Sequence, residues 1–168
     1  MKFFFILFAA ATLAMSTVVL KPGDKAPDFT TIATDGSHIS LHQFKGTSNV
    51  VLYFYPEDMT SGCTIEACNF RDSHDRFAAT HTVVLGVSLD DQAKHQVFTQ
   101  KDNLNFPLLV DSDSTICRAY GVPINSARHH AARWTFLIDK NGTVVQTYHD
   151  VDPRTHSEQL LKDIAQIK

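Results

Sequence analysis

The stretch that decides the fold is NVVLYFY at residues 49–55, followed by PEDMTSGCTIEAC at residues 56–68. Its first part is a nearly unbroken run of β-branched, aromatic and other apolar residues. Such a run is typical of a strand that is buried on both faces, inside a sheet covered by helices. Pro56 ends this strand, because proline has no N–H to donate to the sheet. Thr60, Ser61 and Gly62 favour the start of a helix, which we expect to run from Cys63 to about Phe77.

The rest of the chain continues the alternation of strands and helices. We expect a second buried strand at 83–88, a helix at 91–102, a short helix at 114–120, strands at 134–138 and 143–148, and an amphipathic helix at 157–167. The sequence Asp139-Lys140-Asn141-Gly142 joins the last two strands, and Asn-Gly is a strong hairpin signal because it supplies positive φ angles. Before the first strand, Asp35-Gly36 marks a turn between short extended pieces, and 40–44 can form a short helical turn.

This order of elements predicts an α/β fold in which a central mixed β-sheet is flanked by helices. It is compatible with a thioredoxin-like architecture, although periodicity alone does not select that fold over other α/β sandwiches. With 168 residues, 43% of them hydrophobic and 20% charged, the chain has room for one well-formed core. We expect a single domain over residues 17–168.

The N-terminus differs in kind from the remainder. After Met1 and Lys2, the residues from Phe3 to Ala14 are apolar or small. This run is shorter than the roughly 20 apolar residues that span a membrane, but it suits a secretory signal. We expect residues 1–16 to be a signal peptide, with cleavage near Ala14 to Ser16, and the protein to be periplasmic or secreted, with no membrane attachment after cleavage. A buried first strand or an uncleaved anchor is the alternative.

The charge distribution predicts no nucleic-acid partner. The formal net charge is −3 and no run of like charges stands out, whereas nucleic-acid binding needs clustered Lys and Arg on one face. The nine histidines are scattered, and we expect most of them at the surface. The pair His129-His130 lacks the spacing of metal ligands on a helix and is expected in a loop.

The cysteines need individual explanations. There are three, Cys63, Cys68 and Cys117, and an odd number argues against a purely structural disulfide framework. Cys63 lies in the first turn of the expected helix, where unpaired N–H groups and the helix dipole favour an anion. A cysteine placed there is expected to be partly thiolate and reactive. The alternative is a small buried apolar residue, as free cysteine often is.

Cys68 follows Cys63 by five positions on the same expected helix. Ideal helix geometry places their α-carbons about 7.5 Å apart along the axis and roughly 140° apart around it. A disulfide tolerates α-carbon separations only up to about 7 Å. A direct bond between the two sulfurs therefore requires the first turns of the helix to unwind.

The same residues carry a resemblance to a known family. The segment from Val51 to Pro56, the Cys63 to Cys68 motif and its continuation Asn69-Phe70-Arg71-Asp72 closely resemble the peroxiredoxin Q family, also called bacterioferritin comigratory protein (Bcp), here in an exported form. The resemblance extends over roughly residues 21–165. It includes GDKAPDF at 23–29, Val87-Ser88 with His95, Phe98 and Lys101, FPLL at 106–109, YGVP at 120–123 and RWTFLID at 133–139.

The resemblance implies a thioredoxin-like fold and a thiol peroxidase acting on hydrogen peroxide and organic hydroperoxides. Cys63 would be the peroxidatic cysteine, and Cys68 would resolve its sulfenic acid as an intramolecular disulfide. Thr60 would position Cys63 and the peroxide, Pro56 would shield the thiolate, and Arg133 would stabilise it and polarise the O–O bond. A thioredoxin-like or other dithiol reductant would complete the cycle. No cofactor and no metal are implied, and a monomer or weak dimer is expected.

Several of these residues could have a purely structural role instead. Thr60 can be only a helix cap, Pro56 only a strand terminator and Arg133 only a surface cation. Glu66 either pairs with Arg133 or merely favours the helix. Ser61 stands where this family commonly has proline; serine can still cap a helix, but we expect it to stiffen the loop less.

Cys117 lies in a short helix that is expected to face the core. We expect it to be a buried filler, with a weaker alternative as a second resolving thiol.

Two other functions compete with peroxide reduction. A thioredoxin-like disulfide oxidoreductase usually has two residues between its cysteines, whereas four separate Cys63 and Cys68. A Sco-like copper-binding protein needs two thiolates close enough to bind one soft ion together, and cysteines five positions apart on a helix are poorly placed for that.

Overall fold

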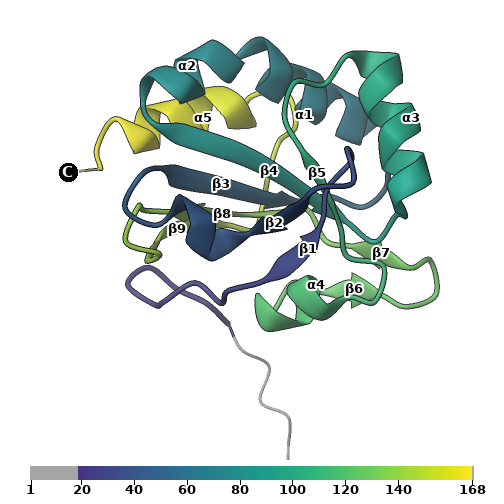
Figure 1. The fold of residues 1–168 in the computed structure, drawn as a ribbon, viewed down its shortest axis with the longest axis horizontal. Helices are drawn as coiled ribbons and strands as arrows, with labels where there is room; N and C mark the ends of the chain where they lie inside the picture. The colour runs from purple at the N-terminus through teal and green to yellow at the C-terminus, as the bar shows by residue number, and fades with distance from the viewer. Residues whose placement is uncertain (1–18, 168) are drawn as a thin grey trace, which may run out of the picture.

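The computed structural model describes residues 19–167, and the expected signal peptide lies outside that range. A five-stranded sheet runs through the centre of the molecule (Figure 1). Its strands, in spatial order, are β5 (Leu108–Val110), β4 (Thr82–Ser88), β3 (Asn49–Phe54), β8 (Trp134–Ile138) and β9 (Val144–Tyr148). Strands β3, β4 and β5 are parallel, whereas β8 is antiparallel to both β3 and β9. The predicted mixed sheet is confirmed.

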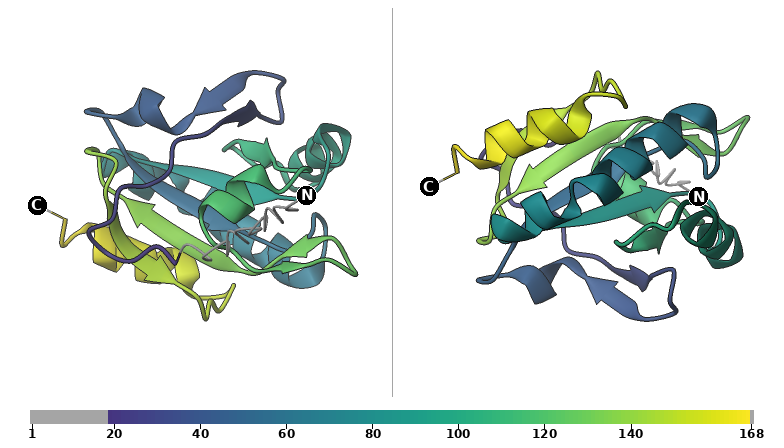
Figure 2. Two further views of the ribbon diagram at one scale, coloured as in Figure 1. Left: turned by 90° about the horizontal axis from the view of Figure 1, so that it is seen from below. Right: turned by 90° about the horizontal axis from the view of Figure 1, so that it is seen from above.

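Helices connect and cover these strands. They are α1 (Ser61–Asp72), α2 (His74–Ala79), α3 (Gln92–Asp102), α4 (Thr115–Ala119), α5 (His156–Ile164) and the 3₁₀ helix η1 (Leu41–Phe44). Helices α1 and α2 form the crossover between β3 and β4, and α3 forms the crossover between β4 and β5, as parallel neighbours require. Helices α1, α2 and α5 lie over one face of the sheet, and α4 and the β1–β2 hairpin (Thr30–Ile32 and His38–Ser40) lie under the other (Figures 1 and 2).

Strand β3 is buried on both faces, as its unbroken apolar run predicts. Val51 and Tyr53 belong to the core on the face covered by α1, α2 and α5, whereas Leu52 and Phe54 belong to the core on the opposite face. All four side chains are at most 1% exposed. Because successive side chains of a strand point to opposite faces, one short segment supplies the centre of both cores. The chain leaves this strand at Tyr55 and enters the loop that leads to α1.

The expected helix from Cys63 to about Phe77 is two helices. Ser73 separates α1 from α2 with φ −96° and ψ 3°, outside the α-helical region. Serine is a weak residue in helix interiors because its side chain competes for backbone hydrogen bonds. The change of direction keeps both Phe70 and Phe77 in the core above the sheet.

Two further expectations need correction, and strand β5 has no counterpart in the sequence analysis, because three residues carry too little periodicity. The His129-His130 segment is not all loop: His130 begins strand β7 (His130–Ala131), which pairs with β6 (Ile124–Asn125). In the β8–β9 hairpin only Gly142 takes a positive φ, of 73°, and the Asp139 side chain accepts hydrogen bonds from the backbone N–H groups of Asn141 and Thr143.

Two histidines are fully enclosed, although most lie at or near the surface as expected. His95 is 0% exposed and His156 is 1% exposed. Over residues 19–167, no helix is long and apolar enough to cross a membrane.

Gly86 in β4 allows the aromatic layer of β3 to pack closely. A methyl group at Gly86 would lie 2.8 Å from both Leu108 Cδ2 and the Tyr53 hydroxyl. These neighbours are themselves buried and cannot move aside without disturbing the core.

We predict that Gly86→Ala lowers the free energy of unfolding by about 1–3 kcal/mol, the usual cost of overpacking a core. Urea denaturation measures this loss. The control is Val97→Ala in α3, whose side chain is 52% exposed and whose replacement is expected to change stability by no more than about 0.5 kcal/mol. Equal midpoints for Gly86→Ala and the unmodified protein would contradict the packing argument.

Candidate active site

Cys63 is the third residue of α1 and lies in the first turn of this helix, close to the loop that connects it to β3. Thr60 is the cap residue, with extended backbone angles of φ −74° and ψ 153°, and its carbonyl accepts a hydrogen bond from Thr64 N at 2.8 Å. The N–H groups of the first turn have no intrahelical acceptor, and the positive end of the helix dipole lies there. Cys63 is only 1% exposed. The position therefore combines a helix N-terminus, which favours negative charge, with almost complete burial of the sulfur.

Arg133, the residue directly before β8, reaches this sulfur. Its Nη2 donates a hydrogen bond to Cys63 Sγ at 3.2 Å. The approach follows from the sheet register, because Trp134 pairs with Phe54. Arg133 and the loop after β3 consequently lie at the same end of the sheet. Gly62 lies beside the guanidinium, since a methyl group on it would be in van der Waals contact with Arg133 Nη2, at 3.4 Å. The Arg133 side chain is 18% exposed, so the alternative reading of Arg133 as only a surface cation does not hold.

Glu66 pairs with Arg133, which answers the question left open by the sequence. The Glu66 carboxylate binds Arg133 Nη1, and the Glu66 side chain is 1% exposed. Burial raises the pKa of Glu66 from 4.5 to about 7, although the charge of Arg133 opposes this rise. The carboxylate therefore holds the guanidinium beside Cys63 from the next turn of the same helix.

Cys68 lies on α1, partly exposed, and both cysteines are free thiols in this structure. Burial raises the pKa of Cys68, and the nearby Arg71 guanidinium opposes the rise. Since Cys63 and Cys68 occupy one continuous helix, the helical separation expected from the sequence applies. This form of the protein therefore has the two sulfurs apart.

The loop between β3 and α1 contains Pro56 and Thr60. Pro56 follows Tyr55 and is half-buried. Thr60 makes no capping hydrogen bond with its side chain; its hydroxyl instead donates to the Glu57 carbonyl at 3.1 Å. The hydroxyl oxygen keeps its capacity to accept. The chain thus brings Pro56, Thr60, Cys63 and Arg133 to one end of the sheet, with Cys68 further along α1.

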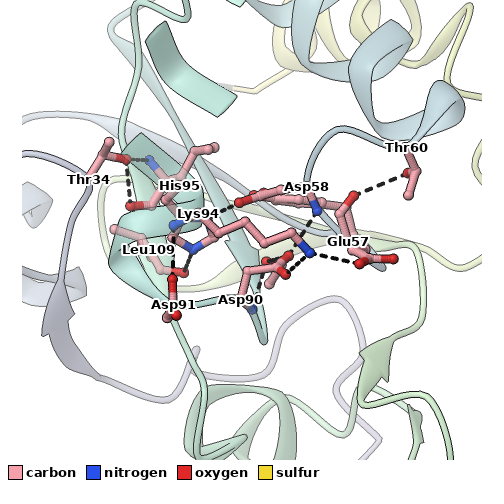
Figure 3. Close-up of polar contacts among 12 residues, drawn as sticks. Thr34, Glu57, Asp58, Thr60, Asp90, Asp91, Lys94, His95 and Leu109 are labelled. Carbon is pink, nitrogen blue, oxygen red and sulfur yellow. Dashed lines mark hydrogen bonds and ion pairs between the residues drawn. The ribbon is translucent and has the colours of Figure 1, made fainter. Parts of the chain in front are cut away.

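A buried polar network behind this loop was missed by sequence reasoning. Asp58, 3% exposed, lies between Tyr55 and His95, and its Oδ2 is 2.8 Å from His95 Nδ1 (Figure 3). Asp58 and His95 are 37 residues apart in the chain. His95 was noted only as part of the family resemblance, and no local pattern pairs it with Asp58.

Cys117 is buried in α4, as expected, with 0% exposure. Its backbone N–H donates to Asp111 Oδ2 at 2.8 Å. Burial raises the pKa of the Cys117 thiol well above its usual value, and the Asp111 carboxylate adds to the rise. Such a thiol is a poor nucleophile.

Comparison with known proteins agrees with this geometry. Residues 22–147 match the sequence model of the AhpC/TSA family. Peroxiredoxin Bcp of Bacillus subtilis (strain 168) is 41% identical over 157 residues, which cover 89% of this chain and 99% of the relative.

Solved structures are similar over the same span. The crystal structure of peroxidoxin BcpB from Mycobacterium tuberculosis superposes with a TM-score of 0.83 at 31% identity, covering 89% of this chain and 99% of that one. A Xanthomonas campestris bacterioferritin comigratory protein, whose structure is described in terms of alkyl peroxide reduction activity, superposes with a TM-score of 0.77 at 28% identity, covering 89% and 98%.

The chain belongs to the AhpC/TSA family of thioredoxin-like peroxidases. Within that family its relatives are the Bcp, or peroxiredoxin Q, enzymes, so the protein is a peroxiredoxin and a thiol-dependent peroxidase. The resemblance to the peroxiredoxin Q family is confirmed, whereas the exported form stays a prediction. Among residues 19–167 no group of three or more His, Cys, Asp or Glu side chains is arranged to hold a metal ion.

The raised pKa of Glu66 predicts a pH dependence of stability. The folded protein holds the Glu66 proton more strongly than the unfolded chain does, so this carboxyl stabilises the fold most below its ordinary pKa of 4.5. The contribution is lost as the pH rises through about 7. We expect the difference in unfolding free energy between the unmodified protein and Glu66→Gln to fall over that interval and then level off, as measured by urea denaturation.

The matched control is Glu158→Gln. Glu158 is an exposed carboxylate paired with Arg76, and the hydrogen bond from Arg76 lowers its pKa below 4.5. Its difference curve is expected to stay flat above pH 4.5. A flat curve for Glu66→Gln as well would contradict the assignment of a raised pKa to Glu66.

Proposed function

We propose that Cys63 is the peroxidatic cysteine and that Cys68 resolves its sulfenic acid as an intramolecular disulfide. The observation that carries the proposal is the 3.2 Å contact between Arg133 Nη2 and Cys63 Sγ, at the first turn of α1. A buried sulfur with a guanidinium and a helix N-terminus beside it is stabilised as a thiolate. The thiolate is the form that attacks peroxide.

In the proposed first step, the thiolate sulfur attacks one peroxide oxygen. The S–O bond forms as the O–O bond breaks, the leaving oxygen takes a proton, and water or an alcohol departs. Arg133 stabilises the negative charge that moves from sulfur to the leaving oxygen. Thr60 donates to the Glu57 carbonyl, so its oxygen is available to accept the hydrogen of the peroxide O–H. Pro56, which is half-buried in the same loop, limits the access of water to the thiolate.

In the proposed second step, Cys68 condenses with the sulfenic acid, an S–S bond forms and water leaves. Both residues lie on α1, so its first turns unwind to bring the sulfurs together. A thioredoxin-like or other external dithiol then reduces the disulfide by exchange. We propose a monomer or weak dimer as the working form.

The proposed substrates are hydrogen peroxide and organic hydroperoxides. The alkyl peroxide reduction described for the Xanthomonas campestris relative supports the organic substrates. The partly exposed position of Cys68 supports access by a reductant.

We predict that Cys63→Ser abolishes peroxide consumption, because no other thiol has the guanidinium and the helix N-terminus beside it. Cys68→Ser is expected to complete one turnover and to stop with a sulfenic acid at Cys63. Stopped-flow reaction of the reduced protein with one equivalent of hydrogen peroxide, followed by intact mass and peptide mapping, measures both results.

Cys117→Ser is the control, since a buried thiol outside the pocket is expected to leave both steps intact. Full turnover by Cys68→Ser, with a disulfide between Cys63 and Cys117, would show that Cys68 is not the resolving residue.

We further propose that residues 1–16 direct export and are removed. The support is the apolar run from Phe3 to Ala14 after a single cation, which lies before the part matched by the family. We predict that the protein expressed from its full sequence in a bacterium begins near Ala14 to Ser16, as read by intact mass of the periplasmic fraction. Retention of Met1 in a protein confined to the cytoplasm would refute export.

A further inference from the structure

Asp58 lies in the loop between β3 and Cys63, and hydrogen bonds to both of its carboxylate oxygens and from its backbone N–H hold it in place. Its Oδ1 accepts a hydrogen bond from the Tyr55 hydroxyl at 2.6 Å, and its Oδ2 lies 2.8 Å from His95 Nδ1. Its backbone N–H donates to Asp90 Oδ2 at 2.9 Å. The Asp58 and His95 side chains are each 0% exposed. A carboxylate buried in this way is retained only when its hydrogen bonds are satisfied.

His95 makes a hydrogen bond with each of its two ring nitrogens, one toward Asp58 and one toward Leu109. His95 Nε2 lies 3.2 Å from the carbonyl oxygen of Leu109, and a carbonyl can only accept, so Nε2 carries hydrogen. A second hydrogen must lie between Nδ1 and Asp58 Oδ2, either on the ring or on the carboxyl, because two acceptors would repel each other. In both arrangements the two side chains are held as one unit, with His95 as the link between the loop and β5 (Figure 3).

The residue after Asp58 needs such support. Met59 has φ 61°, in the left-handed region that residues other than glycine seldom adopt. Strained backbone of this kind is unfavourable and persists where its surroundings determine it. The next residue, Thr60, accepts the backbone hydrogen bond of Thr64. The geometry of the first turn of α1 is therefore set immediately after Met59.

The partners of Asp58 all lie outside α1. Tyr55 directly follows β3, Asp90 comes shortly after the end of β4, and His95 lies in α3. Glu57, the residue before Asp58, is also bound to α3 through Lys94. Lys94 Nζ lies 2.7 Å from Glu57 Oε1 and 2.6 Å from Asp90 Oδ1 (Figure 3). The loop can therefore keep its shape while the first turns of α1 unwind.

We propose that His95, acting through Asp58, is a positioning residue for Cys63. It holds the loop 56–60 in the shape that sets Thr60 and Cys63 against Arg133, both when peroxide is attacked and when α1 refolds after reduction. The inference rests on the proposed peroxidatic role of Cys63. His95 lies on α3 and touches neither the sulfur nor the peroxide, so its proposed effect is exerted through Asp58.

Two substitutions of His95 separate positioning from simple filling of the core. In His95→Gln the amide N–H₂ takes the place of Nε2 and can donate to Leu109, but no donor faces Asp58. In His95→Asn the amide N–H₂ takes the place of Nδ1 and still donates to Asp58. Asparagine leaves the larger cavity, so a filling role makes His95→Asn the more damaged variant. A positioning role makes His95→Gln the more damaged variant.

The readouts are two reactions of Cys63 in the reduced protein. Stopped-flow reaction with hydrogen peroxide depends on the alignment of Thr60, Cys63 and Arg133, whereas alkylation by iodoacetamide needs only a reactive thiolate. We expect His95→Gln to slow the peroxide reaction by about 10- to 100-fold, the scale of a misplacement of roughly 1 Å, with an unchanged alkylation rate. His95→Asn is expected to stay closer to the unmodified protein in the peroxide reaction.

Urea denaturation checks that each variant is folded under assay conditions. If neither His95 variant folds, Tyr55→Phe replaces them, because it removes one hydrogen bond to Asp58 and keeps the ring. It is expected to slow the peroxide reaction alone. A slower His95→Asn than His95→Gln, or peroxide rates equal to that of the unmodified protein in the folded variants, overturns the positioning role. Failure of the unmodified protein to react with peroxide would instead overturn the proposed function.

Discussion

The hydrogen bond between Arg133 and Cys63 is the contact around which the rest of this molecule is arranged. It joins the beginning of a helix to the beginning of a strand 70 residues later in the chain. It exists because β8 pairs with β3 in a register that sets Trp134 opposite Phe54. Glu66 fixes the other arm of the guanidinium from within the protein interior. A buried cation is costly unless it is paired and hydrogen-bonded, and here the sulfur and the carboxylate together meet that requirement.

The proposed chemistry, with two cysteines on one helix, makes opposite demands on neighbouring segments. In that mechanism the helix that holds Cys63 and Cys68 is ordered for the first step and opens for the second. The loop before it, which carries backbone strain at Met59, keeps its shape in both steps. The structure separates these demands. Asp58 makes hydrogen bonds with Asp90, shortly after β4, and with His95 in α3, so its contacts do not involve α1. The ion pair of Glu66 with Arg133 does depend on α1 remaining helical, because Glu66 lies on that helix.

Much of the fold followed from local patterns. The apolar run of β3, the turn residues of the β8–β9 hairpin and the amphipathic α5 each carry their own signal, because periodicity and turn chemistry are properties of short segments. The break at Ser73 and the short strand β5 carried no such signal. Their conformation is set by neighbours in space: Phe70 and Phe77 share one core, and β5 completes the edge of the sheet beside β4.

The sequence by itself indicated a reactive cysteine, because a cysteine in the first turn of a helix and a second cysteine five positions later depend only on local geometry and spacing. The family resemblance, which is also read from the sequence, implied the peroxide chemistry and added Arg133 as a candidate. Only the tertiary structure decided that Glu66 binds Arg133 and that His95 binds Asp58. Such pairs join residues far apart in the chain, and their existence depends on strand register and helix packing, which no single segment specifies.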